Sequence, residues 1–459
     1  MRTLRHITSI NELETEEIKA IFTRADFYLQ KLGDQSTPYR IARSLNELPG
    51  RILAGLFYEP STRTRLSFES AMLRLGGKAM ASADPRTSSA SKGESLADTV
   101  RVTSSYADIL VVRHPRDGAA RLAASYAPVP VINGGDGSHE HPTQTLLDLF
   151  TLRRRKKALR NLNVAISGDL KASRTIHSFV YALARFEANI VLKPAPGMEL
   201  PDDVAWRLEN EFLRQRTNDA QTGEVWYVAP GRQPRRRSID AVYVTRFQSE
   251  RWPNAAGAYP KVNAEFLRKK EFRATAVMHP LPRVNELDLS LDRDRRAAWF
   301  EQAAYGVPIR MAIIAALLAT RGRQGLKRYP EGFSRAHAPL FEGDATSGVM
   351  CINGNCIVHD PVDGPYAERK FRVIASEPPR LRCFYCETDI DTFWIGDANS
   401  KTVFASDEPF SDWSRNSTPS LRFYRTPDAA EKAGFSRRST ELSPTPMKRR
   451  AHLHHERRR

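Results

Sequence analysis

The sequence predicts an α/β protein with two doubly wound parallel-sheet domains, a small β-rich domain and a disordered basic tail. Short apolar runs alternate with amphipathic helical patterns from residue 13 to residue 320, which is typical of parallel sheets covered by helices. Four cysteines form two close pairs beyond residue 350, which indicates a separate small domain. The last residues have no apolar spacing and cannot form a core of their own.

The first expected domain covers residues 1–152. An amphipathic helix is expected at residues 13–32, and strands are expected at 52–57, 109–112 and 129–133. The apolar residues after the first strand have the spacing of one helix face: Phe68, Ala71, Met72 and Leu75. Gly76-Gly77 ends that helix, because glycine adopts a left-handed cap at little cost.

The second expected domain covers residues 153–296, with a strand at 162–166, a helix at 174–186 and a strand at 240–245. The remaining expected segments follow in order: a helix at about 297–325 completing the first domain, a linker at 326–348, the cysteine domain at 349–390, an extension of unknown role at 391–435 and the disordered basic tail at 436–459.

The chain carries a formal net charge of +17, from 70 basic and 53 acidic residues, and this balance attracts anions without identifying one. Much of the excess lies in the runs 235–237, 448–450 and 457–459. No N-terminal signal peptide pattern is present, and the longest apolar helical run, 309–320, is shorter than the roughly 20 residues that span a bilayer. We therefore expect a cytoplasmic protein with no membrane partner.

The segment from Phe57 to Arg65 places three hydroxyls and two guanidiniums between the first strand and its helix. Helix N-terminal amides and the positive end of the helix dipole attract anions, and arginine adds forked donors that match phosphate. An ordinary Ser/Thr cap with solvated arginines is the alternative for such a run taken alone.

Two later motifs each contain a histidine followed by a proline, next to an expected helix or strand. His141-Pro142-Thr143-Gln144 opens a second helix, and His279-Pro280-Leu281-Pro282-Arg283 follows an apolar run. The prolines of the second motif stiffen a turn and leave backbone carbonyls free to accept hydrogen bonds. A single histidine of this kind is more often structural than catalytic.

These three motifs, in this order, resemble the transcarbamylase family. The segments 112–115, 133–138 and 168–171 match it as well, and the resemblance covers residues 5–325, closest to the catalytic chains of aspartate carbamoyltransferases. It implies the transcarbamylase fold and carbamoyl transfer from carbamoyl phosphate to the α-amine of L-aspartate, the second step of de novo pyrimidine biosynthesis. No catalytic cofactor is expected.

The resemblance also implies roles for residues at matching positions. Ser61, Thr62, Arg63 and Thr64 match the phosphate cradle; Thr64, Arg113 and His141 match the groups that polarise the carbonyl; Gln144 and the carbonyls of Pro280 and Leu281 match the groups that hold the carbamoyl NH2. His141 would act as a hydrogen-bond donor and not as the base. The amine attacks directly, so no nucleophilic Ser or Cys is needed.

Aspartate has two carboxylates, and Arg174, Arg246 and Gln248 match the family's aspartate ligands. Ser88 and Lys92 match residues that reach into a neighbouring subunit's site, which implies a homotrimer with shared active sites. An ornithine or other amino-acid carbamoyltransferase is the near alternative. Ornithine enzymes typically have Cys where Pro280 stands, and Arg246 would repel a cationic substrate.

The four cysteines have the spacing of a structural zinc site: Cys351, Cys356, Cys383 and Cys386. Disulfides are the alternative, which a reducing cytosol disfavours. These turns resemble the zinc domain of the aspartate carbamoyltransferase regulatory chain, including the ending from Cys383 to Glu387. That chain also carries a nucleotide-binding domain, for which the linker leaves no room, so we expect no nucleotide regulation of that kind.

A different class of function is a non-catalytic nucleic-acid-binding or scaffold protein that uses its basic tail. Arginine-rich tails bind phosphate backbones without specificity. The tail also holds His452, His454 and His455, for which a solvated tail is the simpler interpretation than a metal site. Because every polar position of the family's site is present, nucleic acid is not expected as the main partner.

Overall fold

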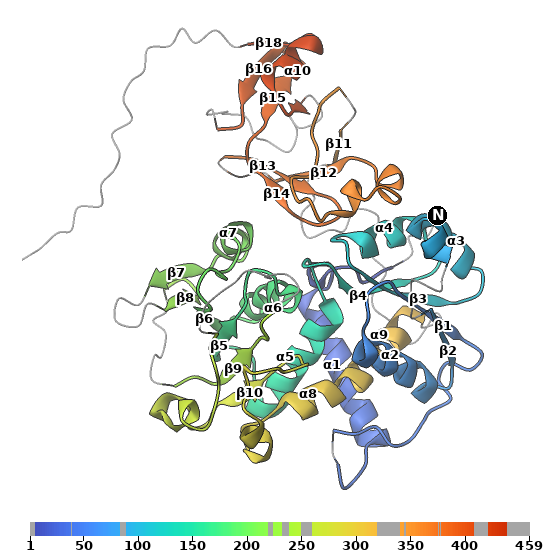
Figure 1. Cartoon of the computed structure of the whole chain (residues 1–459), viewed down its shortest axis with the longest axis vertical. Coiled ribbons are helices and arrows are strands. Elements are labelled where there is room, and N and C mark those ends of the chain that lie inside the picture. The colour runs from blue at the N-terminus through green and yellow to red at the C-terminus, as the bar shows by residue number, and fades with distance from the viewer. Residues whose placement is uncertain are drawn as a thin grey trace, which may run out of the picture. The chain divides into compact units, whose positions relative to one another are not determined.

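The structure is a computed structural model, and its elements are labelled in Figure 1. It describes residues 5–37, 39–82, 89–218, 224–231, 238–248, 259–318, 340–343, 346–374, 376, 378–407 and 421–437. Two compact units are present. The larger contains two α/β halves and a small cysteine-containing module, and the smaller is built around the last four strands.

The first half is built on a four-stranded sheet with strand order β2-β1-β3-β4, and all its described pairs are parallel. Its elements are α1 (Thr15–Leu32), β1 (Ile52–Phe57), α2 (Thr62–Arg74), β2 (Lys78–Ser82), the 3₁₀ turn η3 (Ser89–Lys92), α3 (Leu96–Thr103), β3 (Ile109–His114), α4 (Ala119–Tyr126), β4 (Val131–Asp136) and α5 (Pro142–Lys156). The helices and strands expected here are present; β2, α3 and α4 were not expected individually.

The second half is built on a six-stranded sheet with order β10-β9-β5-β6-β8-β7. Its elements are β5 (Asn163–Gly168), α6 (Arg174–Arg185), β6 (Asn189–Pro194), α7 (Asp202–Asn210), β7 (Gln215–Asn218), β8 (Val225–Val228), β9 (Ala241–Val244) and β10 (Ala276–Met278). The pairs from β10 to β6 are parallel, as predicted. β8 and β7 add an antiparallel edge that the sequence patterns did not indicate.

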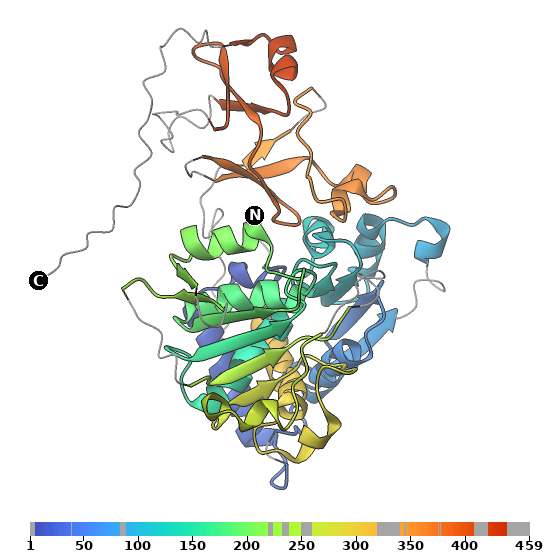
Figure 2. The same ribbon diagram turned by 60° about the vertical axis from the view of Figure 1, so that its left-hand side comes forward.

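Helices join the two sheets. α5 lies between them (Figure 1), α6 packs on β6 of the second sheet, and α7 packs against α6 (Figure 2). After β10 the chain forms α8 (Trp299–Ala304) and α9 (Gly306–Leu318), and α9 packs against α1 and α2 of the first half. Apolar residues of both halves share one buried core, which runs from Ile7 to Ala315 in sequence.

The helix α2 illustrates how local sequence produces this core. Phe68, Ala71, Met72 and Leu75 are each at most 1% exposed, as their spacing predicts. Gly76 adopts φ +85°, and a Cβ at this position would lie 2.8 Å from the carbonyl oxygen of Leu45. Only glycine therefore ends this helix without strain.

The cysteine module, residues 351–374 and 381–390, contains most of a four-stranded sheet with antiparallel pairs. Its strand order is β11-β12-β13-β14, formed by β11 (Leu340–Glu342), β12 (Lys370–Ile374), β13 (Arg380–Cys383) and β14 (Asp389–Ile390). β11 lies in the segment expected to be a linker and pairs antiparallel with β12.

The smaller unit is a sheet of order β17-β15-β16-β18 with one helix. Its elements are β15 (Trp394–Asp397), β16 (Thr402–Ala405), β17 (Leu421–Tyr424), α10 (Pro427–Lys432) and β18 (Ser436–Arg437). The tail histidines and the rest of the basic tail lie outside the described residues. Among the helices that the structure describes, none combines the length and apolarity needed to cross a bilayer.

Candidate active site

The predicted site residues follow the carboxyl ends of parallel strands, where open α/β sheets bind ligands. Ser61 and Arg63 come after β1, Arg113 lies near the end of β3, and His141 follows β4. In the second half, Arg174 opens α6 after β5, Arg246 follows β9, and Pro280 follows β10. Residues far apart in sequence are thereby gathered at the strand ends of both sheets.

Three of these side chains converge on the backbone of Gly135. Gly135 has φ +113°, and a Cβ built there would lie 2.8 Å from Arg113 Nη1, 3.2 Å from His141 Cδ2 and 3.4 Å from Arg174 Cζ. The position therefore requires glycine, both for its backbone conformation and for the close approach of the three groups. The structure thus brings together two predicted carbamoyl phosphate ligands and one predicted aspartate ligand.

Glu59 holds two of these arginines. Its carboxylate accepts hydrogen bonds from Arg113 Nη2 at 3.1 Å and from Arg174 at 2.8 and 2.9 Å. Arg113 also donates to the carbonyl of Gly134 at 3.0 Å, and Arg174 donates to that of Gly137 at 2.9 Å. Sequence reasoning missed Glu59. The available signal was an acid placed directly before the run of hydroxyls and guanidiniums.

The cluster is strongly cationic. Burial and the neighbouring Arg174 lower the pKa of Arg113 to about 9, against the opposing effect of Glu59. Burial, with Arg113 and Arg174 next in effect, lowers the pKa of His141 well below 6.5, so this imidazole is neutral at pH 7. His141 Nδ1 and Arg113 Nε are buried without a hydrogen-bond partner among the described residues. Such buried polar atoms are rare unless a ligand or water is to meet them.

Arg310 of α9 also lowers the pKa of His141, and it is not among the site residues predicted from the sequence. This arginine is 3% exposed and donates to Ser67 Oγ at 3.0 Å and to Thr143 Oγ1 at 3.3 Å. It therefore connects α9 to α2, whose first turn carries the predicted phosphate cradle, and to α5, which carries the predicted ligand Gln144.

The first turn of α2 carries the predicted phosphate cradle. Ser61 is the N-cap residue, Thr64 is buried, and Thr62 and Arg63 are exposed. Partial desolvation of its guanidinium, followed by the charge of Arg246, lowers the pKa of Arg63, although the residue as a whole is exposed. Arg63 and Arg246 therefore influence one another electrostatically, although they follow strands of different sheets.

Gln144 is oriented by a buried carboxyl group. Its Nε2 donates to Asp148 Oδ1 at 2.9 Å, and Asp148 also accepts from Tyr243 Oη at 2.8 Å and from Gln302 Nε2 at 2.6 Å. Burial raises the pKa of Asp148 to about 7, against the effect of these donors. One carboxyl group thus joins α5, β9 and α8 beneath the site.

His279 holds the turn that contains Pro280 and Leu281. The Leu281 N–H donates to His279 Nδ1 at 2.8 Å, so Nδ1 is an acceptor and Nε2 carries the proton that it shares with Glu286 Oε1 at 2.8 Å. The His279 N–H donates to Gln302 at 2.9 Å. Leu281 has φ +53° and precedes a cis proline, Pro282. The predicted carbonyl acceptors therefore lie on a turn that three hydrogen bonds of His279 hold in place.

The remaining predicted ligands have different positions. Gln248 Nε2 donates to Asp169 Oδ2 at 3.1 Å, and Arg246 Nη1 donates to the Phe247 carbonyl at 3.2 Å. Lys92 ends η3 and is exposed, with no hydrogen bond or ion pair to the described residues of this cluster. Ser88 lies outside the described residues.

The four cysteines converge as their spacing predicts. All are buried, with Cys351 Sγ 3.4 Å from Cys386 Sγ and Cys356 Sγ 3.9 Å from Cys383 Sγ. A disulfide requires about 2.05 Å, whereas a tetrahedral zinc with bonds of about 2.3 Å separates its sulfurs by about 3.8 Å. The residues therefore fit a structural metal ion that would hold the two turns together.

A second cluster of potential metal ligands, formed by one histidine and two glutamates, is less suited to a cation. The ligand atoms of His139, Glu140 and Glu387 lie within 4.8 Å of one another. Glu387 is already paired with the guanidiniums of Arg121 and Arg207, which would repel a metal ion.

The strand ends of the first half carry the predicted phosphate cradle, and Arg174 and Arg246 follow strands of the second half, as expected for an enzyme of the carbamoyltransferase class. Residues 5–154 match the family model for the carbamoyl-P binding domain of aspartate/ornithine carbamoyltransferases, and residues 160–317 match that for the Asp/Orn binding domain. The chain belongs to this family. Residues 346–395 match the metal binding domain of the aspartate carbamoyltransferase regulatory chain.

Similar proteins narrow the class. The aspartate carbamoyltransferase catalytic subunit of Methanocaldococcus jannaschii is 43% identical over 319 residues, which are 69% of this chain and 98% of that subunit. The corresponding subunit of Archaeoglobus fulgidus is 42% identical over 321 residues, covering 69% and 99%.

Solved structures agree. The M. jannaschii aspartate transcarbamoylase catalytic subunit has a TM-score of 0.58 at 41% identity, with 69% of this chain and 98% of that chain covered. The Trypanosoma cruzi aspartate transcarbamoylase in complex with N-(phosphonacetyl)-L-aspartic acid has a TM-score of 0.59 at 37% identity, covering 69% and 96%. The transcarbamylase fold predicted from the sequence is confirmed.

Proposed function

We propose that this chain is an aspartate carbamoyltransferase, which converts carbamoyl phosphate and L-aspartate to N-carbamoyl-L-aspartate and phosphate in de novo pyrimidine biosynthesis. The observation that carries the proposal is the convergence of Arg113, His141 and Arg174 on Gly135. It brings two ligands of one substrate and one of the other together at the strand ends.

The phosphate of carbamoyl phosphate binds at the first turn of α2. Ser61, Thr62 and Thr64 offer hydroxyls, Arg63 offers a guanidinium, and the free amides of the helix start complete the cradle. Gln144 and the carbonyls of Pro280 and Leu281 hold the carbamoyl NH2 group. The Asp148 and His279 networks keep these acceptors in place.

Attack by the amine puts negative charge on the carbamoyl oxygen. Thr64, Arg113 and the neutral imidazole of His141 donate to that oxygen, and donors fixed in advance are typically worth several kcal/mol in such a step. The C–N bond forms, the C–O bond to phosphate breaks, and the departing phosphate takes the proton that the amine loses.

Selectivity for aspartate comes from the second half. Arg174, Arg246 and Gln248 meet the two carboxylates, and a cationic side chain such as that of ornithine would be repelled by Arg246. Lys92 is exposed at the end of η3, and together with Ser88 it serves the active site of a neighbouring copy. The functional assembly is a homotrimer with shared active sites, and it works in the cytoplasm.

The metal of the cysteine cluster is zinc, held by Cys351, Cys356, Cys383 and Cys386. It has a structural role, because all four ligand positions are filled by thiolates and none is left for a substrate.

The deciding experiment incubates the purified chain with carbamoyl phosphate and either L-aspartate or L-ornithine. Phosphate release and product mass are followed. We expect N-carbamoyl-L-aspartate and no citrulline. Citrulline as the main product, or no carbamoylated product from either amino acid, would overturn the proposal.

A further inference from the structure

Glu387 of the cysteine module is bound by both halves of the catalytic body. One carboxylate oxygen lies 2.7 Å from Nη2 of Arg121 in α4, and the other lies 3.0 Å from Nη1 of Arg207 in α7. α4 belongs to the first half and α7 to the second. Both arginines are less than a tenth exposed. A single, largely enclosed carboxylate, 13% exposed, therefore connects the two halves through the module.

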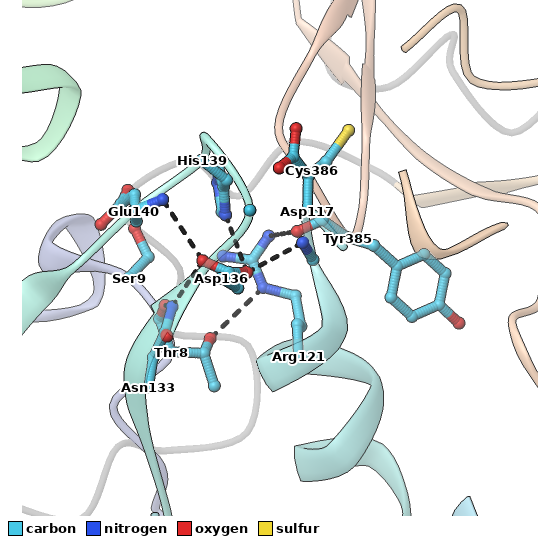
Figure 3. A network of polar contacts seen from close by, with 12 residues as sticks. Thr8, Ser9, Asp117, Arg121, Asn133, Asp136, His139, Glu140, Tyr385 and Cys386 are labelled. Atoms are coloured by element: carbon cyan, nitrogen blue, oxygen red, sulfur yellow. Dashed lines mark hydrogen bonds and ion pairs between the residues drawn. The ribbon is translucent and has the colours of Figure 1, made fainter. Parts of the chain in front are cut away.

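The module is attached to the first half by many contacts. Asp117 accepts from Asn353 Nδ2 at 2.7 Å and from Asn355 Nδ2 at 3.0 Å. Arg121 extends from α4 toward the module (Figure 3) and donates to the carbonyls of Phe384 and Tyr385. Breaking one of these contacts leaves the others, so the module stays attached to this half.

The attachment to the first half also depends on a close backbone approach. A Cβ at Gly118 would lie 2.6 Å from the Tyr385 backbone carbon and 2.9 Å from the Cys386 nitrogen. With φ +83°, this position admits glycine alone without strain.

Two ion pairs reach the second half. Besides Arg207 with Glu387, Arg382 of the module pairs with Glu211 at 2.6 Å, immediately after α7. Arg382 is itself held by Asp389 at 2.6 and 2.8 Å. α7 is therefore the element of the second half that the module grips.

α7 is connected to the predicted aspartate ligand Arg174. It packs against α6, and the Arg207 guanidinium lies over the ring of Tyr181 at 4.5 Å. Tyr181 lies on α6, whose first residue is Arg174. α7 is thus linked through Tyr181 to the helix that presents Arg174.

We propose that Glu387 is a positioning residue for carbamoyl transfer: it clips the two halves and holds the aspartate ligands of the second half at the separation from the first-half cradle that the reaction needs. The kinetic part of this inference rests on the proposed function. Glu387 touches no substrate, so its effect reaches the site through Arg207 and α6.

The test is Arg207→Gln in the full-length chain purified with its metal. This variant breaks the contact of Glu387 with the second half, leaves Glu387 bound to Arg121 and keeps the Arg382–Glu211 pair. We expect KM for aspartate to rise roughly ten-fold, in the usual range of coupling between sites, while kcat and the inhibition constant of inorganic phosphate stay within about two-fold. Arg216→Gln, a change at an exposed arginine of β7, is the matched control and should alter none of these.

Two further variants separate positioning from general damage. Arg207→Lys keeps the charge and should recover part of the aspartate affinity. Glu211→Gln breaks the second grip on α7 at a more exposed point and should raise KM for aspartate in the same direction if Arg207→Gln fails to fold. An unchanged KM in the folded variant, or an equal loss of phosphate affinity, would overturn the proposal.

A readout independent of activity separates this inference from the proposed function. In a double-mutant cycle on thermal unfolding, Glu387→Gln and Arg207→Gln should be non-additive, because both remove one contact. If the unmutated chain forms no carbamoyl aspartate, the proposed function fails while the cycle still tests the clip. Additive effects would show that the two residues are not coupled.

Discussion

Arg113 and Arg174 share the carboxylate of Glu59. Arg113 lies near the end of β3 in the first sheet, whereas Arg174 begins α6, the helix that follows β5 of the second sheet. Glu59 thus joins the two halves at the strand ends, while Glu387 joins them through the cysteine module. It also offsets part of the positive charge that two closely spaced guanidiniums concentrate there.

Glu59→Gln should weaken aspartate binding. The substitution keeps the shape of the side chain but removes the charge that orients Arg174, and a hydrogen bond to a charged group is worth about 1.5–3 kcal/mol. We expect KM for aspartate to rise by roughly ten- to a hundred-fold. Steady-state kinetics measures this KM. The control is Glu69→Gln, whose described ionic contact is a 4.0 Å pair with Arg65 on α2. Equal kinetics for the two variants would contradict the assigned role of Glu59.

Arg63→Ala should impair the chemical step. Arg63 matches the group that stabilises the departing phosphate, and loss of one such donor typically costs about 10²–10³ in kcat. Phosphate release under saturating substrates measures it. Arg160→Ala, at an exposed arginine paired with Glu187 at 2.9 Å, should leave kcat unchanged. Normal turnover of the Arg63→Ala variant would show that Arg63 does not stabilise the departing phosphate.

The strand–helix motif of the first half was predictable because its signals are local. The apolar run before Phe57 and the spacing from Phe68 to Leu75 fix a strand and a helix within a short stretch, and both are confirmed. The cysteine cluster was predictable for the same reason, since metal ligands come in closely spaced pairs. Site residues could then be placed by the family resemblance.

The ionic contacts of Glu59 and Glu387 could not be predicted, because they have no local pattern. Glu59 is separated from Arg113 by 54 residues and from Arg174 by 115. Glu387 is 266 residues from Arg121 and 180 from Arg207. Charged residues of this kind look like solvated surface groups in the sequence. Only the folded structure shows that they are paired with one another.

His141 should remain neutral throughout the assay range. Burial and three neighbouring arginines lower its pKa well below 6.5, so the folded state binds fewer protons here than the unfolded chain does below that pH. Its contribution to stability is therefore fully present above about pH 6.5 and is lost as the pH falls toward the folded-state pKa. NMR of the imidazole, assigned with His141→Gln, should show no titration from pH 6 to 8. A midpoint between 6 and 7 would contradict the neutral donor.

Asp148 should make stability depend on pH in the opposite direction. Its folded pKa of about 7 lies above the ordinary 3.8, so the folded state binds the extra proton. The stability that this proton supplies is fully present below pH 3.8 and is lost as the pH rises through about 7. The difference in unfolding free energy between the unmutated chain and Asp148→Asn should therefore shift in favour of the variant between pH 5 and 8. A difference that is flat with pH would mean that Asp148 is ionised throughout.

Removal of the metal should weaken aspartate binding before it abolishes chemistry. The cysteine cluster holds the turns that carry Asn353 and Glu387, whereas none of the four thiols is near the phosphate cradle in sequence or touches the cluster at Gly135. Elemental analysis should find one zinc per chain. Structural zinc is bound with apparent free energies of about 10–16 kcal/mol, so a strong chelator or Cys383→Ser is needed to remove it.

The metal-free chain should then unfold at a lower temperature and show a raised KM for aspartate, because the clip through Glu387 is released. Its affinity for inorganic phosphate should change little, since the cradle lies within the first half. Re-addition of zinc should restore the original values, and Cys383→Ser should not respond. Loss of phosphate affinity in parallel with aspartate affinity would instead assign the module to the folding of the first half.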